Sequence, residues 1–387
     1  MNVRIPRRRH TKTVAMPLAD RLESNDPALE RPSRLQPAQL SNLAHRRQYR
    51  FQRNRGGITL AAAMTNPPDF EVSSGGAIAL QPVAIARRSP SQLFWARLRQ
   101  DKAALAGGIV IIVLILIAIF GGPLAEHITG HGQNSTYDSM TDEFGVPKGP
   151  NSQFWFGADS AGRDLFVRTM YGARISLFVG IVATGFALFI GLVVGLLAGF
   201  FGGFIDTVLS RFADVLLAVP QILIAVGVVA ACSTSKQGCL GGLLQPGLPV
   251  VIAVITVFSW SYIARIVRGY TLSLREKEFV EASRSLGATN LRILASEMLP
   301  NLIGPLVVYA TLLIPTNILF EAALSYLGLG VPPNEASWGS ILNDASGYYD
   351  VAWWLMLFPG AFLIITTLAF NLLGDGLRDA FDVRSER

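Results

Sequence analysis

Residues 176–201 read SLFVGIVATGFALFIGLVVGLLAGFF and contain no ionisable side chain. A helix needs about 20 such residues to cross the hydrocarbon core of a bilayer. Five further stretches are similarly long and apolar, at 105–124, about 212–232, 248–267, 302–327 and 352–373. Because apolar residues fill these stretches instead of forming one stripe, the helices must meet lipid or one another on every side. The sequence therefore predicts an all-α membrane protein with six transmembrane helices.

The composition of the 387-residue chain agrees with this architecture. Charged residues make up 16% of the chain, whereas soluble domains carry about 25%. Two cysteines and four histidines are too few for a disulfide-built scaffold or a histidine-based metal centre. The sequence contains no Walker motif, no HExxH zinc motif and no GxSxG nucleophile elbow. We therefore expect no catalytic residue, no metal site and no cofactor bound by this chain.

Lysine and arginine beside the apolar stretches predict the orientation of the chain. They cluster before the first stretch and between the fourth and the fifth: Arg87, Arg88, Arg97, Arg99 and Lys102, then Arg268, Arg275, Lys277, Arg284 and Arg292. Because cytoplasmic loops carry this excess, both termini and the loop at 274–300 are expected in the cytoplasm. The net charge of +6 is thus explained without a nucleic-acid partner. Arg163, Arg168 and Arg174 depart from the rule, because they fall in an expected external loop.

The remaining segments differ in composition. Residues 1–89 are rich in Arg, Pro and Ser and are expected to form a disordered, basic cytoplasmic tail, with Met64 as an alternative start of translation. The order expected after this tail is an interfacial helix at 90–104, the first transmembrane helix at 105–125, an external loop at 126–171, a transmembrane core at 172–375 and a cytoplasmic tail at 376–387.

Glycine and proline modify the predicted helices. Gly191, Gly195 and Gly199 are spaced four residues apart, which places them on one helix face and lets another helix approach closely. Pro220 and Pro315 each remove a backbone hydrogen bond, which predicts a kink in the third helix and in the fifth.

Ionisable residues are almost absent from the predicted membrane interior. Glu321 is the nearest candidate, and at 1.5 Å per residue it lies about 28 Å along the helix that starts at Leu302, near the outer interface. Ion-driven carriers usually need buried carboxylates or histidines as relays. An ion-coupled secondary carrier is therefore disfavoured, and Glu321 is a candidate for a pathway residue or a structural one.

Both cysteines of the chain, Cys232 and Cys239, fall in one predicted external loop. The short polar segment between them can fold back to bring the Cα atoms within about 6 Å, and disulfides persist outside the cytoplasm. The alternative is two free thiols, with Cys232 buried as a small apolar residue. We predict a disulfide that fixes the outer end of the third helix.

The loop at 274–300 has the pattern of two short helices joined by a fixed corner. The first, expected over 276–286, carries apolar residues on one face: Phe279, Ala282 and Leu286. Gly287 follows where a left-handed C-cap needs glycine, Thr289 can cap the second helix, and Pro300 opens the next span. Such a corner fits a groove in a partner protein, and the alternative is an amphipathic loop on lipid.

The same loop resembles the EAA motif of ABC importer permeases. Six residues keep the spacing of that motif: Glu281, Ala282, Ser283, Gly287, Leu299 and Pro300. Ser283 replaces the third small residue of the motif, and Glu297 stands where an apolar residue is usual. The resemblance implies that this loop couples the chain to a separate ATPase.

Further stretches are similar to permeases of the dipeptide and oligopeptide (DppC/OppC) family. The expected external loop contains Gly162, Arg163 and Asp164 in the order of that family's motif, and stretches at 321–330, 333–339 and 373–379 also agree with it. The similarity covers about 90–385. It implies the type I ABC importer permease fold, a multi-pass location in the cytoplasmic membrane, and a subunit that is not itself an enzyme.

The resemblance also implies partners. They are a second, homologous permease, one or two ATPase subunits that use ATP and Mg²⁺, an extracellular solute-binding protein and a short peptide substrate. Nickel, glutathione or another small solute is the alternative cargo. A membrane scaffold or sensor without transport is disfavoured by the motifs of the external loop.

Overall fold

The computed structural model describes residues 90–234, 238–242, 244–332 and 334–381, so the predicted tail at 1–89 and residues 382–387 lie outside it. The described residues form helices joined by loops, with isolated β-bridges and no strand among them. Five of their helical runs are long and apolar enough to cross a membrane, or six if one bent pair of helices counts as a single span. The predicted all-α membrane class is confirmed.

The first span is the helical run Lys102–Thr129, made of α3 (Lys102–Leu116), the π-helical η1 (Ile117–Gly121) and α4 (Gly122–Thr129). A separate helix, α2 (Pro90–Gln100), precedes it. The Asp101 carboxylate accepts hydrogen bonds from the amides of Ala103 and Ala104 and so begins α3. The interfacial helix predicted over 90–104 therefore ends earlier, because Asp101 caps the next helix.

The second span, α5 (Leu165–Phe201), begins well before its predicted start at 176. Asp164 caps it by accepting hydrogen bonds from the amides of Phe166 and Val167. The loop between α4 and α5, which holds the 3-10 helix η2 (Asp138–Met140), is therefore shorter than the predicted 126–171. Apolarity alone could not predict this start, because the first turns of α5 include charged residues whose partners are distant in the sequence.

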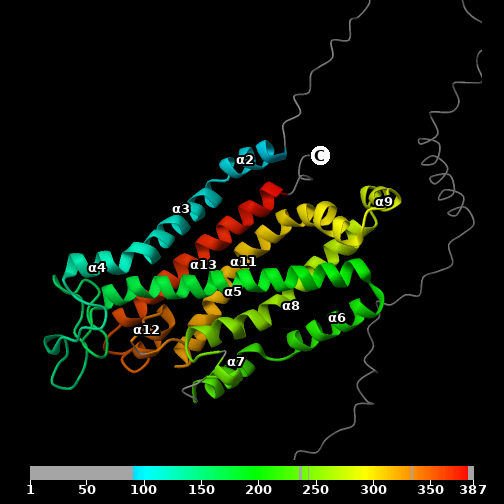
Figure 1. Ribbon diagram of the computed structural model, residues 1–387. Coiled ribbons are helices and arrows are strands. Elements are labelled where there is room, and N and C mark those ends of the chain that lie inside the picture. Colours follow the sequence, from blue (N-terminus) through cyan, green and yellow to red (C-terminus); the bar gives the residue numbers. More distant parts are fainter. Residues whose placement is uncertain (1–89, 235–237, 243, 333, 382–387) are drawn as a thin grey trace, which may run out of the picture. The chain divides into compact units, whose positions relative to one another are not determined.

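The predicted third helix at 212–232 is two helices, α6 (Gly203–Ala218) and α7 (Gln221–Thr234), which are bent by 86° (Figure 1). Val219 between them has an extended backbone, as expected for a residue before proline. Pro220 therefore breaks the helix instead of only kinking it. Pro315 lies inside α11 (Leu299–Tyr326), which continues through it.

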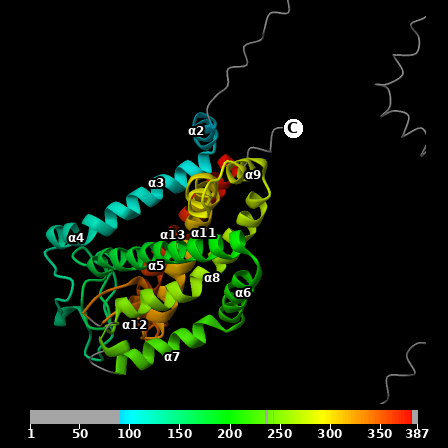
Figure 2. The ribbon, with the colours of Figure 1, turned by 45° about the vertical axis from the view of Figure 1, so that its right-hand side comes forward.

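Three glycines bring α5 close to α8 (Leu248–Arg275), and the two helices lie side by side in Figures 1 and 2. A Cβ atom added to Gly191, Gly195 or Gly199 would lie 2.7, 2.6 or 2.7 Å from the Cβ atoms of Ile263, Val267 and Thr271, respectively. No side chain fits at such distances without displacing α8. The predicted close approach of another helix to this glycine face is confirmed.

A short helix, α9 (Glu278–Ser285), follows α8, and a continuous helical run then extends over Asn290–Tyr326. This run consists of α10 (Asn290–Arg292), the π-helical η4 (Ile293–Met298) and α11. The second short helix predicted before Pro300 is therefore not separate, because η4 passes directly into α11. The described part ends with α12 (Trp338–Ala345) and α13 (Trp354–Phe381), and α13 extends past the predicted start of the C-terminal tail at 376.

Figure 1 shows two ends of the helical bundle, which we name after the short helices that mark them. The helices α2 and α9 lie at the α9 end. At the α12 end lie α4, α12 and the loop between α4 and α5. Because α5, α8, α11 and α13 run between these ends, the 274–300 loop and the predicted external motif lie at opposite ends of the bundle.

Candidate functional site

The turn after α9, where the resemblance places the EAA motif, is closed by a Schellman motif. The amide of Ala288 donates to the carbonyl of Ser283 at 3.0 Å. Between them, Gly287 has φ of 80°, a left-handed conformation that favours glycine. The Thr289 side chain then accepts a hydrogen bond from the amide of Arg292 and begins the next helix. We call residues 278–289 the α9 corner, and these caps give it one defined shape.

One side of the α9 corner is packed against the long helices. Val280 is fully buried in a cluster with Phe200 at the end of α5 and with residues of η4: Ile293, Leu294 and Met298. Arg275 at the end of α8 donates a hydrogen bond to the carbonyl of Phe200 at 3.2 Å. The corner is therefore attached to α5, α8 and the run that contains α11, so a displacement of α9 acts on all three.

The other side of the α9 corner faces outward and combines apolar and charged groups. Leu286 is 89% exposed, and Leu291, just beyond the corner, is 77% exposed. Beside them a hollow of about 310 Å³ is lined by charged and polar residues: Arg275, Glu276, Glu281, Arg284 and Ser285. Exposed leucines beside such a charged rim are typical of a surface that binds a protein partner.

The six residues of the predicted coupling motif do not share one surface. Four belong to the α9 corner: Glu281, Ala282, Ser283 and Gly287. Leu299 and Pro300 lie at the start of α11, beyond η4. Leu286 and Leu291 are exposed side chains that the motif does not include. The sequence signal for Leu291 is its place in the first turn after the Thr289 cap.

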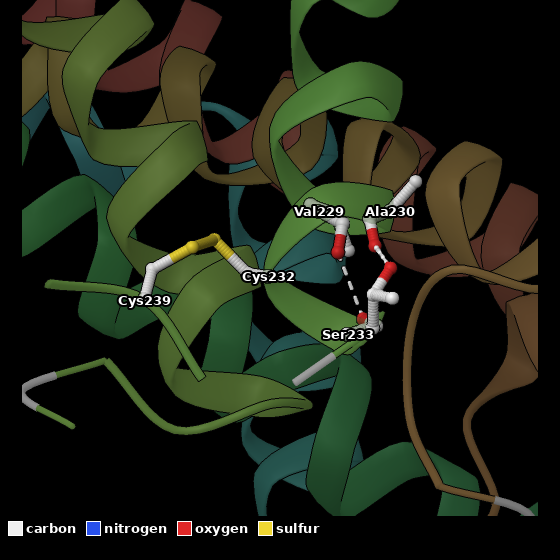
Figure 3. Close-up of a disulfide and its surroundings, with 6 residues drawn as sticks. Val229, Ala230, Cys232, Ser233 and Cys239 are labelled. Atoms are coloured by element: carbon white, nitrogen blue, oxygen red, sulfur yellow. Dashed lines mark hydrogen bonds between the residues drawn. A yellow bond between two sulfur atoms is a disulfide. The ribbon is translucent and has the colours of Figure 1, made fainter. Parts of the chain in front are cut away.

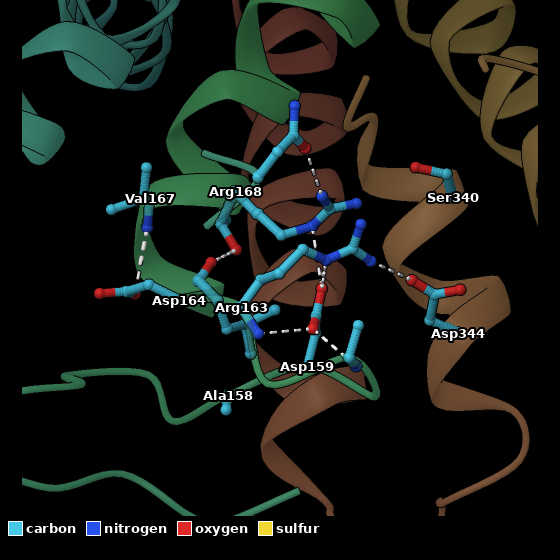
Figure 4. Close-up of polar contacts among 12 residues, drawn as sticks. Ala158, Asp159, Arg163, Asp164, Val167, Arg168, Ser340 and Asp344 are labelled. Carbon is cyan, nitrogen blue, oxygen red and sulfur yellow. Dashed lines mark hydrogen bonds and ion pairs between the residues drawn. The ribbon is translucent and has the colours of Figure 1, made fainter. Parts of the chain in front are cut away.

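At the α12 end, Arg163 of the predicted external motif belongs to an ion-pair cluster, shown in Figure 4 and named here the α12 clasp: Asp159, Arg163, Arg168 and Asp344. Asp159 and Arg168 are buried, whereas Arg163 and Asp344 are partly exposed. Arg163 Nε donates to Asp159 Oδ2 at 2.7 Å, and Arg168 Nε lies 3.1 Å from the same oxygen. Arg163 Nη2 lies 3.5 Å from Asp344 Oδ2. The clasp therefore joins the loop before α5, α5 itself and α12.

Charge in the α12 clasp is balanced, with two carboxylates against two guanidinium groups. Burial raises the pKa of Asp344 above the usual range of a carboxyl, and the nearby Asp159 adds to the rise, whereas Arg168 and Arg163 oppose it. Because Arg163 and Arg168 are neutralised inside the protein, they do not act as free positive charge in the expected external loop. The sequence signal for this cluster is the alternation of Asp and Arg over 159–168, but Asp344 gives no such signal.

The other two residues of the predicted motif shape the loop before α5. Gly162 has φ of 73°, and its carbonyl accepts a hydrogen bond from the amide of Tyr137 at 3.0 Å. Asp164 caps α5, and its Oδ2 lies 2.7 Å from Nδ1 of His131, whose ring stacks on Phe154. Gly162, Arg163 and Asp164 thus hold the loop in shape against α5 and α12.

Glu321 is fully buried where α11 meets α5 and α12. The hydroxyl groups of Ser176 and Ser325 donate to its carboxyl group at 3.0 and 2.6 Å. The amide of Trp338 donates in turn to Ser176 Oγ at 3.3 Å. Of the two roles left open by the sequence, this arrangement favours the structural one, because the carboxyl group connects three helices and is enclosed by them.

Cys232 at the end of α7 and Cys239 in the following loop form a disulfide, with their Cα atoms 5.0 Å apart (Figure 3). Cys232 is 1% exposed and belongs to the apolar cluster of α5, α7 and α8. The amide of Cys239 donates to the carbonyl of Leu244 at 2.9 Å. The bridge therefore attaches the loop after α7 to the end of that helix.

Two cavities lie among the long helices. One of about 370 Å³ lies between α5, α6 and α8, and two ion pairs line it: Arg268 with Asp206, and Arg265 with Asp214. The other, of about 330 Å³, lies between α7, α8 and α11 and has no charged side chain in its lining. Within the residues that the structure describes, no group of three or more His, Cys, Asp or Glu side chains is arranged to hold a metal ion.

Known families match most of the described chain. The binding-protein-dependent transport system inner membrane component matches residues 191–387. The N-terminal transmembrane domain of oligopeptide transport permease C matches residues 89–142. Over 54% of this chain, and 94% of the other, the structure also superposes on a chain of the inward-facing MetNI methionine ABC transporter, with 25% identity and a TM-score of 0.45.

Three relatives align over about three quarters of this chain. The oligopeptide transport system permease protein OppC of Bacillus subtilis (strain 168) is 42% identical over 290 residues, 74% of this chain and 87% of OppC. The dipeptide transport system permease protein DppC of the same organism is 39% identical over 304 residues, 77% of this chain and 87% of DppC. The glutathione transport system permease protein GsiD of Salmonella typhimurium is 44% identical over 301 residues, 76% of this chain and 91% of GsiD. The chain therefore belongs to the family of binding-protein-dependent transport system inner membrane components, as a multi-pass ABC importer permease of the DppC/OppC type.

Proposed function

We propose that this chain is one of two transmembrane subunits of an ATP-driven importer that carries dipeptides and oligopeptides across the cytoplasmic membrane. A second, homologous permease is the other subunit, and an external solute-binding protein delivers the peptide. One or two separate ATPase subunits bind ATP and Mg²⁺ and hydrolyse the nucleotide, so this chain binds no cofactor. The family and the relatives named OppC and DppC support the proposal.

The α9 corner is the observation that carries the proposed coupling to an ATPase. It presents exposed leucines and a charged hollow outward, while its other side is packed on the long helices. We place this end of the bundle in the cytoplasm, because Lys and Arg are concentrated in the 274–300 loop and before the first span. A groove on the ATPase would take Leu286 and Leu291, with Glu281 and Arg284 at its rim.

Movement of the ATPase subunits would then be transmitted from the α9 corner to the membrane-spanning helices that are connected to it. The run from α10 through η4 leads from the corner into α11, and Val280 packs the corner against α5 and η4. Arg275 joins the end of α8 to the end of α5. The ion pairs of Arg268 and Arg265 tie α6 to α8, so α6 would follow that helix. The break between α6 and α7 lets α7 keep its own direction. Such helices, displaced as one body, are a known route for switching between two states.

Glutathione import is the second candidate function, because the relative GsiD is 44% identical and is named a glutathione transport permease. Nickel or another small solute is a further alternative within the importer class. Outside that class the alternative is an ion-coupled carrier, which would work without an ATPase and without the α9 corner.

Transport by the reconstituted complex tests the proposal. The chain is combined with the second permease, the ATPases and the binding protein, and substrate is offered on the side opposite to ATP. The substrates are dipeptides to pentapeptides, glutathione and Ni²⁺, each with a non-hydrolysable ATP analogue as control. We expect peptides to accumulate only with hydrolysable ATP. Accumulation of glutathione or Ni²⁺ without peptides would replace the peptide assignment, and peptide uptake driven by an ion gradient alone would contradict ATP coupling.

A further inference from the structure

The cavity between α7, α8 and α11 lies near the middle of the membrane-spanning helices. Thr316 in its lining precedes the end of α11 by 10 residues (326 minus 316), and Ser259 follows the start of α8 by 11 residues (259 minus 248). At 1.5 Å per residue, each lies about 15 Å from the end of its helix. Half the hydrocarbon thickness of a bilayer is also about 15 Å, so the cavity is far from both membrane surfaces.

The lining of this cavity is polar and aromatic, but it carries no carboxylate, ammonium, guanidinium or imidazole group. Its hydroxyl and amide groups come from six residues: Gln221, Ser259, Tyr262, Tyr309, Thr316 and Asn317. The remaining lining is apolar. Every polar group in it is therefore an uncharged hydrogen-bonding partner at neutral pH.

Hydrogen bonds hold the polar wall of the cavity in place. Asn317 is 2% exposed, and its Oδ1 accepts a hydrogen bond from Ser259 Oγ at 2.8 Å. The amide nitrogen of Asn317 donates to Thr184 Oγ1 at 2.9 Å. These bonds connect α11 to α8 and to α5 at a depth where unsatisfied polar groups are costly. The polar wall is thus a built part of the bundle.

We propose that this cavity is the part of the transport pathway contributed by this chain, and that it binds short peptides in transit. Asn317 and Ser259 hold the wall in place, whereas the hydroxyl groups of Tyr262, Tyr309 and Thr316 and the side-chain amide of Gln221 pair with backbone amides of the peptide. The aromatic rings contact varied side chains. The inference rests on the proposed function and specifies where in the chain the peptide passes.

The chemistry of the lining separates peptides from a nickel cargo. A nickel ion would require imidazole, thiolate or carboxylate ligands, which the lining lacks. Glutathione carries two carboxylates against one ammonium group at neutral pH, the same charges as an acidic tripeptide, so the neutral lining does not distinguish it from peptides. A short peptide of varied sequence needs amide partners and apolar surface, and the lining supplies both.

Protection of an introduced cysteine tests the location of the pathway. Thr316→Cys places a thiol in the cavity, and Leu319→Cys is the matched control, because Leu319 lies on the same helix, is exposed and is absent from the lining. Both native cysteines are in the disulfide, so the reagent labels the introduced cysteine and not the native ones. In the assembled complex, we expect the tripeptide Ala-Ala-Ala to slow methanethiosulfonate labelling at least threefold at residue 316 and not at residue 319. Equal labelling rates with and without peptide at residue 316 would overturn the proposal.

Charge placed in the cavity tests the substrate class. Thr316→Asp and Thr316→Lys should shift the ratio of Ala-Lys-Ala to Ala-Asp-Ala import in opposite directions, by at least fivefold between them, and neutral Thr316→Asn should not shift it. A ratio unchanged in all three variants, in complexes that still import Ala-Ala-Ala, would overturn the assignment of the cavity. Failure of the wild-type complex to import any peptide would instead contradict the proposed function itself.

Discussion

At the scale of single residues, Arg168 is the clearest test of the α12 clasp. It is 2% exposed, and its partner Asp159 is fully buried. Arg168→Ala would leave the Asp159 charge with less compensation, and breaking a buried ion pair costs about 3–5 kcal/mol. We expect a large fall in the thermal stability of the purified complex. Arg211→Ala is the control, because Arg211 is 81% exposed and pairs with Asp214 at 3.9 Å. Equal effects of the two substitutions would show that the clasp does not stabilise the fold.

Gly287 and Glu281 test the coupling assigned to the α9 corner. Proline cannot adopt the φ of 80° at Gly287, and Glu281→Lys reverses a charge in the hollow beside the leucines. We expect Gly287→Pro and Glu281→Lys to insert normally but to lose most ATP-dependent peptide uptake and co-purification with the ATPase. Glu278→Lys is the matched control, because Glu278 is in the same helix but outside the lining of the hollow. Normal uptake in both test variants would remove the coupling role.

At the scale of elements, the contact between α5 and α8 depends on glycine. A side chain at Gly195 would begin 2.6 Å from the Cβ of Val267, whereas Gly185 on the same helix has nothing within 4 Å. Gly195→Val should therefore overpack the contact and destabilise the protein by about 2 kcal/mol, whereas Gly185→Val should have little packing effect. Thermal unfolding of the two variants in detergent measures the difference. If both melt alike, the glycine face is not what brings the helices together.

The disulfide at the end of α7 is the second prediction at this scale. Closing so short a loop is expected to stabilise the fold by about 2 kcal/mol. We expect Cys232 and Cys239 to resist alkylation until the protein is reduced, as measured by mass spectrometry of the non-reduced protein. Alkylation of both residues without reduction would show that the bridge is absent. Labelling in intact cells only by a membrane-permeant reagent would contradict the expected orientation.

At the scale of the whole molecule, the segment before Met64 is expected to be dispensable. Its composition gives too little apolar surface to form a core, and it lies outside the residues that the structure describes. Expression from Met64 should therefore restore peptide uptake in a strain that lacks the full gene. The full-length chain at matched expression is the control. Failure of the shortened chain to insert or to bind its partners would give the segment a structural role.

The sequence by itself determined the features that depend on neighbouring residues. Continuous apolar stretches predict transmembrane helices, because a bilayer leaves the backbone few other structures. Gly287 predicted the end of α9, because a left-handed C-cap is a local requirement. Glycines spaced four residues apart predicted a close helix contact, although not that α8 would make it.

Only the tertiary structure decided the features that join distant residues. The clasp needs Asp344 beside Arg163, and the cavity needs Asn317 beside Ser259, and neither pairing leaves a local pattern. The start of α5 was missed for the same reason, because Arg168 and Arg174 in its first turns bond to Asn134 and to the carbonyl of Ile119, which are distant in the sequence. The apolarity of a segment predicts whether that segment spans the membrane. An ion pair or a cavity depends instead on which segments the fold brings together.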